Sequence, residues 1–104
     1  MNDEVARAAR YCAELLGYEL REDGIWMRPD GGYGSTWTHA KLISSVDAQA
    51  PLLPLLRAKM GIVFIDATVY SDEVIVTVGE NDGSAPDEPS ARLIAIARAL
   101  GWVE

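Results

Sequence analysis

The chain has 104 residues, of which 49% are hydrophobic and 24% charged, with a formal net charge of −7. This length is typical of one domain, the apolar content excludes an intrinsically disordered chain, and the negative charge argues against direct nucleic-acid binding. The sequence contains no run of the roughly 20 apolar residues that a membrane helix needs and no apolar core of a signal peptide, and the lone Cys12 excludes an internal disulfide. We therefore expect one domain, 1–104, in a reducing cytoplasmic compartment.

Residues 3–16 predict an amphipathic helix, because apolar side chains recur there at the roughly 3.6-residue spacing of one helix face. Asn2 or Asp3 is suited to cap its start, and Gly17 supplies the left-handed residue that commonly ends a helix. Cys12 lies on the apolar face, where we expect a buried thiol that acts as a small hydrophobic side chain.

Residues 18–28 predict a β-hairpin, because Asp23-Gly24 separates two alternating runs and is the signature of a two-residue type I′ turn. This turn would pair Leu20 with Met27 on the side that faces the core. The opposite side would then carry Glu19, Arg21, Trp26 and Arg28, with Glu19 facing Arg28.

The middle of the chain is less regular. Residues 29–37 are rich in turn-forming residues, and residues 38–46 are compatible with a third strand, a short helix or an ordered loop. Residues 47–60 predict a helix with a leucine-rich buried stripe that ends at Gly61. Pro51 and Pro54 are tolerable in that helix only if both lie in its first turn.

Residues 62–79 predict a second hairpin, because two runs dense in β-branched residues are joined by Ser71-Asp72. Val63, Ile65, Ala67 and Val69 would share one face with Val74, Val76 and Val78. Because Ile62, Phe64 and Ile75 make the other face apolar as well, we expect these strands to be at least partly covered on both sides and central in the sheet.

Residues 80–90 predict a polar loop, followed by a closing helix at 90–100 that Gly101 ends. Pro89 suits the first turn of this helix, and Asp87 and Glu88 lie near the positive end of its dipole. The order of a helix followed by a hairpin occurs twice along the chain. It reflects either an internal duplication or simply the use of glycine to end helices.

These elements predict an α+β fold. Its four-stranded antiparallel sheet is formed by the hairpins 18–28 and 62–79, and it is flanked by three helices at about 3–16, 47–60 and 90–100 in an α-β-α sandwich-like arrangement.

The sequence contains no recognisable catalytic constellation. His39 has no patterned acid or nucleophile beside it, and one cysteine with one histidine cannot form a zinc site without two carboxylates. Residues 80–83 lack the alternating ligands of a calcium loop, and residues 31–34 lack the Gly-Lys-Ser/Thr of a phosphate loop. We therefore expect no enzyme, no metal and no cofactor; an enzyme that works through carboxylates alone is the weaker alternative.

The acidic residues are unevenly distributed. Residues 1–60 hold seven bases and eight acids, whereas residues 61–104 hold two bases and eight acids. The excess either keeps a small protein soluble or steers it onto a basic partner surface. With the aromatic and arginine residues typical of binding hot spots, it gives a candidate protein-contact surface composed of Arg21, Trp26, Arg28, Tyr33, Trp37, Glu80, Asp82, Asp87 and Glu88. In the alternative, a helix covers the first hairpin and Trp26 belongs to the core.

The segment GYELREDGIWMRPDGG, followed by a Ser/Thr turn and the closing ARLIAIARAL, resembles small phage and prophage proteins classed as phage α-β-α sandwich domains. The matching features are Leu16-Gly17-Tyr18, Trp26, Pro29-Asp30-Gly31 and residues 86–100. The resemblance spans roughly residues 10–101, with short structural motifs, and residues 38–60 depart from the single helix of that family. It implies a fold and a phage or prophage origin in a bacterial host, and it brings no catalytic residues, because the family has no established biochemical function.

The predicted order also resembles the small acidic chaperones of type III secretion systems, which run helix, three strands, helix, two strands, helix and act as dimers. We therefore expect a non-enzymatic accessory protein, a monomer or homodimer, that binds a host or viral protein and neither nucleic acid nor membrane. Inhibition of a bacterial defence system is one use of such binding. The alternative is a dimeric chaperone or immunity-type protein that shields a basic partner.

Overall fold

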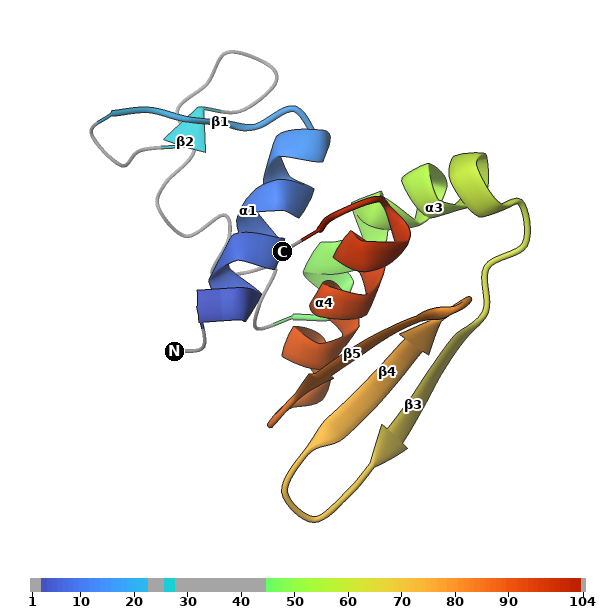
Figure 1. Ribbon diagram of the computed structural model, residues 1–104. Helices are drawn as coiled ribbons and strands as arrows, with labels where there is room; N and C mark the ends of the chain where they lie inside the picture. Colours follow the sequence, from blue (N-terminus) through green and yellow to red (C-terminus); the bar gives the residue numbers. More distant parts are fainter. Residues whose placement is uncertain (1–2, 23–25, 28–44, 104) are drawn as a thin grey trace.

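The computed structural model describes residues 3–22, 26–27 and 45–103 (Figure 1). Along the chain it contains α1 (Asp3–Leu15), β1 (Glu19–Leu20), β2 (Trp26–Met27), the 3₁₀ helix η1 (Asp47–Leu52), α3 (Leu53–Met60), β3 (Ile65–Val69), β4 (Val74–Val78), β5 (Asn81–Ala85) and α4 (Glu88–Ala99).

The main sheet has three antiparallel strands in the order β3-β4-β5, and β1 and β2 form a separate two-stranded hairpin. The predicted four-stranded sheet is therefore wrong. Figure 1 shows β1 and β2 next to α1, away from the main sheet. On the main sheet, α4 packs against β5 and β4 and makes little contact with β3. The described helices thus cover one face of this sheet, in two layers rather than a three-layer sandwich.

β5 lies where the sequence predicts a polar loop. Val78 pairs with Asn81, so Gly79 and Glu80 form a two-residue connection in which only Gly79 has a positive φ, of 62°. This arrangement fits a type II′ hairpin turn, whose first central residue is glycine. The strand NDGSA has little β propensity of its own. The tight turn and the packing of α4 over Gly83 and Ala85, which are buried, compensate for that weakness.

The register of the first hairpin also differs from the prediction. Leu20 pairs with Trp26 and Glu19 pairs with Met27, so the predicted Leu20–Met27 pair is wrong by one residue. This register needs an odd number of connecting residues, whereas a two-residue turn gives an even number. Each strand has only two residues and lies apart from the main sheet. A long strand with one buried face would fix the register through its alternation of apolar and polar side chains, and these short strands lack such a face. The predicted pairing of Glu19 with Arg28 is wrong by the same one-residue shift, because Glu19 lies opposite Met27. Residues 23–25 and Arg28 lie outside the described residues.

The first and last helices are confirmed. α1 buries its apolar face, including Cys12, and Gly17 follows it with a φ of 94°. α4 begins two residues earlier than predicted, at Glu88, because Asp87 caps it: the Asp87 carboxylate accepts a hydrogen bond of 2.9 Å from the backbone N–H of Ser90. Pro89 lies in the first turn, as predicted.

The predicted helix 47–60 is divided into η1 and α3. Pro51 lies inside the 3₁₀ segment and Pro54 in the first turn of α3. A continuous α-helix from Asp47 would place Pro54 in its interior, where the missing N–H and the ring would break it. The α-helix therefore begins only at Leu53, and it ends at Gly61, which has a φ of 77°.

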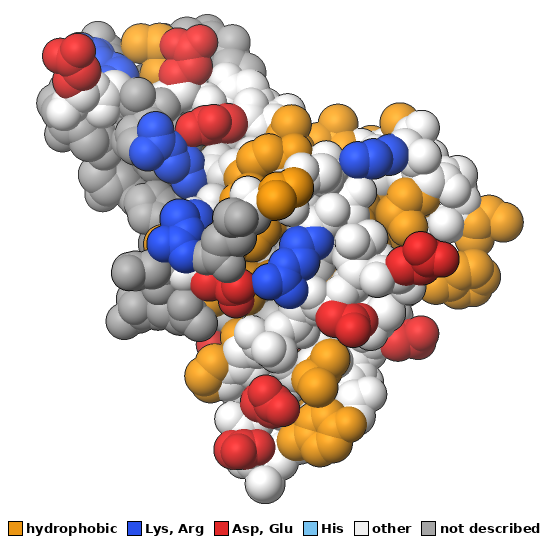
Figure 2. All heavy atoms as spheres, in the orientation of Figure 1, with side chains coloured by type: hydrophobic (Ala, Val, Ile, Leu, Met, Phe, Trp, Pro, Cys, Tyr) orange, Lys and Arg blue, Asp and Glu red, His pale blue; other side chains and the backbone are white. Residues whose placement is uncertain are grey.

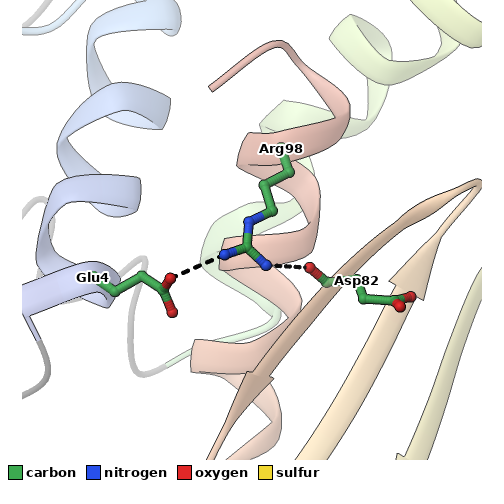
Figure 3. Close-up of polar contacts among 3 residues, drawn as sticks. All are labelled: Glu4, Asp82 and Arg98. Carbon is green, nitrogen blue, oxygen red and sulfur yellow. Dashed lines mark hydrogen bonds and ion pairs between the residues drawn. The ribbon is translucent and has the colours of Figure 1, made fainter. Parts of the chain in front are cut away.

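Arg98 on α4 connects three elements (Figure 3). Its Nη2 donates to Glu4 Oε2 on α1 at 2.9 Å, and its Nη1 donates to the backbone carbonyl of Asp82 on β5 at 2.6 Å. Nearby, the Tyr11 hydroxyl donates to the Leu100 carbonyl at 3.1 Å. These contacts hold α1 and β5 against α4, whose apolar residues dominate the core.

Candidate functional site

The register of the main sheet assigns each side chain to one of two faces. Ala67, Val76 and Gly83 lie opposite one another on the face that α4 covers, and Asp66, Thr77 and Asp82 form the next row on the other face. We call the latter the open face of the sheet. On this face, Thr77 Oγ1 of β4 donates a hydrogen bond of 2.7 Å to Asp82 Oδ1 of β5.

β3 is largely exposed on both faces, and only its first residue, Ile65, is half-buried against the core. On the helix-covered face, Val74 and Val76 of β4 are buried, but Val69, which pairs with Val74, is 72% exposed. On the open face, Asp66 and Thr68 are exposed as well. Figure 1 shows the reason: α4 lies over β5 and β4, and β3 extends beyond it as the outer strand. The predicted central position in the sheet is confirmed for β4 alone. For β3 the prediction is wrong, because this strand lies at the edge of the sheet and is largely exposed.

The backbone of β3 has one unpaired edge. The N–H of Tyr70 donates to the Glu73 carbonyl at 2.8 Å, and the N–H of Gly79 donates to the Phe64 carbonyl at 3.3 Å. In an antiparallel ladder, residue pairs that exchange backbone hydrogen bonds alternate with pairs that do not. Because residues 64 and 70 bond across to β4, the even-numbered residues of β3 direct their backbone groups toward β4. The N–H and C=O groups of Ile65, Ala67 and Val69 therefore point away from the sheet, where no described strand pairs with them.

Large hydrophobic side chains are exposed along β3 and its two ends. Ile62 is 75% exposed, Phe64 70% and Tyr70 53%, in addition to Val69. We define the β3 edge surface as these four side chains with the exposed carboxylates of the strand and the following turn: Ile62, Phe64, Val69, Tyr70, Asp66, Asp72 and Glu73. Figure 2 shows acidic and hydrophobic side chains close together at the lower end of the molecule, where the β3–β4 turn lies in Figure 1.

The chain segment that forms the main sheet carries charge of one sign only, and the described cation nearest to it is Arg98 of α4, which bonds to the backbone of β5. Residues 61–91 contain seven carboxylates and no lysine, arginine or histidine. On the face shown in Figure 2, the lysine and arginine side chains lie over the upper and middle parts of the molecule, and none lies at its lower end. The acids of β3 and of the β3–β4 turn, Asp66, Asp72 and Glu73, are exposed, and their charge favours cationic groups at this end of the sheet.

The predicted contact residues fall in two separate regions. Arg21 is exposed next to the β1–β2 hairpin, whereas Glu80, Asp82, Asp87 and Glu88 are exposed at the main sheet and at the start of α4. Trp26 lies in β2, but its side chain is outside the described part, as are Arg28, Tyr33, Trp37 and His39.

The β3 edge surface was not among the predicted contact residues. The prediction used the apolar character of Phe64 and Ile62 to place the strand in the core. A contrary signal was present, because Phe64 alternates with Asp66 and Thr68, and polar side chains at alternate positions indicate a solvent-exposed face.

The described residues offer little for nucleophilic or metal chemistry. Cys12 is fully buried, and burial raises the pKa of its thiol from 9.0 to about 12. Within ranges 3–22, 26–27 and 45–103, no group of three or more His, Cys, Asp or Glu residues is placed to hold a metal ion. Cys12 therefore acts as a packing residue, as predicted.

The buried thiol should resist alkylation in the folded protein. At about pH 8, the raised pKa lowers the thiolate fraction about a thousandfold relative to the unfolded chain. We expect iodoacetamide to label native Cys12 at least about a thousandfold more slowly than the same chain in concentrated guanidinium chloride, as measured by mass spectrometry. Equal rates in the two conditions would contradict the burial of this residue.

Comparison with protein-family models, with curated proteins and with solved structures gives no match for this chain. Among the helices described, none combines the length and the apolar character that crossing a membrane requires. The β3 edge surface and the acidic sheet around it are therefore the observations on which a function is proposed.

Proposed function

We propose that the chain is a non-enzymatic accessory protein of phage or prophage type, which acts by binding a basic host or viral protein. The observation that carries this proposal is the main sheet itself. Its outer strand exposes Val69, and Phe64 and Tyr70 are exposed at the two ends of that strand, within the segment 61–91, which has seven carboxylates and no basic residue. Exposed apolar side chains surrounded by charge mark protein-interaction sites.

The sign of the charge favours a basic protein over other partners. Phosphate-rich partners such as nucleic acids and anionic lipid surfaces would be repelled by the carboxylates of residues 61–91. A protein surface rich in lysine and arginine would be attracted, and its approach would be accelerated at low salt. Inhibition of a bacterial defence protein is one use of such binding.

The phage origin is supported by the sequence resemblance alone. The open face of the sheet departs from the three-layer sandwich that this resemblance implies, since the described helices cover one face. The chaperone alternative has weaker support, because three strands follow α3 where the chaperone order has two.

Affinity capture with charge-matched variants tests this proposal. The immobilised full chain should retain a bacterial or phage protein of basic isoelectric point from a lysate at about 50 mM salt and release it at about 500 mM, since salt screens charge attraction. Neutralisation of three sheet acids by Asp66→Asn, Asp72→Asn and Glu73→Gln should abolish the retention of that protein.

The matched control removes three exposed acids from the other end of the molecule, by Glu14→Gln, Glu19→Gln and Glu22→Gln. This variant has the same net charge as the sheet variant, and it should retain the partner. The proposal fails if both variants behave alike, or if the captured protein is acidic.

A further inference from the structure

We propose that the free edge of β3 binds an extended segment of the partner, which adds to the main sheet as a strand and alternates apolar with basic residues. This inference rests on the proposed function and specifies how the basic partner is held. It depends on three features of β3: its unpaired backbone groups, its two exposed faces and the charge around it.

The backbone of β3 is ready to accept another strand. Ile65, Ala67 and Val69 direct their N–H and C=O groups away from β4, so an added strand would satisfy hydrogen-bonding groups that the described chain leaves unpaired. Proteins usually protect such edges with lysine, proline or a bulge. The strand IDATV contains none of these protections, and its five residues pair with β4 without interruption.

The side chains on the two faces of β3 define the chemistry of the added segment. Beside Ile65, Ala67 and Val69 the added strand would place alternate residues on the helix-covered face, where apolar side chains would extend the hydrophobic layer. The intervening residues would lie on the open face beside Phe64, Asp66 and Tyr70. Lysine or arginine fits there, because it can pair with the carboxylate and stack on the aromatic rings.

The charge also argues against a second copy of this chain as the added strand. Pairing β3 with another β3 would bring Asp66, Asp72 and Glu73 of both molecules to one interface, and each molecule carries a net charge of −7. Like charges on neighbouring strands destabilise the pairing. A basic segment removes this repulsion, which is why we assign the edge to the partner.

A titration of the full-length protein with synthetic peptides tests strand addition. The probe is a terminally blocked peptide of alternating lysine and valine, followed by NMR of the labelled protein at about 50 mM salt. We expect it to shift the amide signals of β3 and to bind at least tenfold more tightly than a peptide of the same composition with the lysines and valines in separate blocks. An alternating glutamate–valine peptide should not bind.

Peptide N-methylation then separates backbone pairing from charge attraction without altering the protein. Only alternate N–H groups of an added strand face β3. Methylation of either all valine nitrogens or all lysine nitrogens should therefore weaken binding at least tenfold, while methylation of the other set leaves it unchanged. Equal binding of both methylated peptides would overturn strand addition.

A protein variant provides the complementary test. Ala67→Pro removes one outward-facing N–H and no β3–β4 hydrogen bond, and proline is tolerated on an edge strand in that orientation. It should weaken binding of the alternating peptide at least tenfold, whereas Ala67→Val, which keeps the N–H, should not. Unchanged binding by a folded Ala67→Pro variant would count against the inference.

The outcomes distinguish this inference from the proposed function. If both methylated peptides and the block peptide bind equally, and the three neutralising substitutions abolish their binding, charge attraction stands and strand addition is overturned. If sedimentation shows self-association that Ala67→Pro abolishes, the edge binds a second copy and the inference is overturned. Failure of the lysate capture, by contrast, contradicts the proposed function itself.

Discussion

Substitution of Gly83 by alanine is expected to destabilise the fold by about 3 kcal/mol or more, because β5 and α4 approach each other too closely there for a side chain. A Cβ atom at this position would lie 2.6 Å from the backbone nitrogen of Ala95 and 2.9 Å from the Ile94 Cβ. It would come still closer to the carbonyl oxygen of Ala91. Two of these atoms belong to the backbone of α4, so relief requires a shift of the helix.

Thermal unfolding followed by circular dichroism measures this effect. A loss of about 3 kcal/mol lowers the Tm of a domain of this size by roughly 15 °C. The control is Ser84→Ala, one residue further along β5, where the side chain is exposed on the open face and the change should cost less than about 0.5 kcal/mol. Equal Tm values for the two variants would contradict the close contact of β5 with α4.

Leu56→Ala is expected to cost about 3 kcal/mol, the second large effect. Leu56 is fully buried on α3, and it belongs to the same core cluster as Leu93 and Ile94 of α4. The preceding η1 is also tied to α4, since the Gln49 side-chain amide donates to the Pro89 carbonyl at 2.8 Å. Truncation would therefore leave a cavity between elements that are held in place on both sides.

Urea unfolding compares this variant with Leu15→Ala, which removes the same atoms from a side chain that is 43% exposed at the end of α1. The control should cost about 1 kcal/mol or less, and the dependence of unfolding free energy on urea should stay unchanged in both variants. If the two variants lose equal stability, α3 does not contribute to the core as described.

The open edge of β3 links the stability of the fold to its proposed role. α4 stabilises β4 and β5 by burying Val76, Val78 and Ala85, and it leaves the outer strand with exposed faces and an exposed edge. A strand held on one side only is suited to accept another on its free side. In the proposed role, the surrounding carboxylates favour a cationic partner and oppose pairing between copies of the chain.

The acidic character around the candidate site could be predicted from the sequence, but the residues of the β3 edge surface could not. The concentration of acids after residue 60 is a property of composition, and the proposed contact residues Glu80, Asp82, Asp87 and Glu88 are exposed in the structure. The sequence did not identify β3 as an outer strand. Apolar side chains such as Ile62 and Phe64 indicate a buried strand by their type alone, and nothing local shows whether another element covers them. Exposure depends on where α4 lies, and α4 follows β3 by about twenty residues.

Local patterns determined the elements whose signals lie within a few neighbouring residues: α1 and α4 through their apolar periodicity and terminal glycines, and the β3–β4 register through Ser71-Asp72. Tertiary structure alone decided that the polar segment Asn81–Ala85 is a strand, that β1 and β2 stay outside the main sheet, and that β3 is open. The physical reason is that strand pairing and face burial depend on distant partners. At Gly83, α4 packs so closely on β5 that only a residue without a side chain fits. The five residues of the strand contain no local pattern that indicates this close approach.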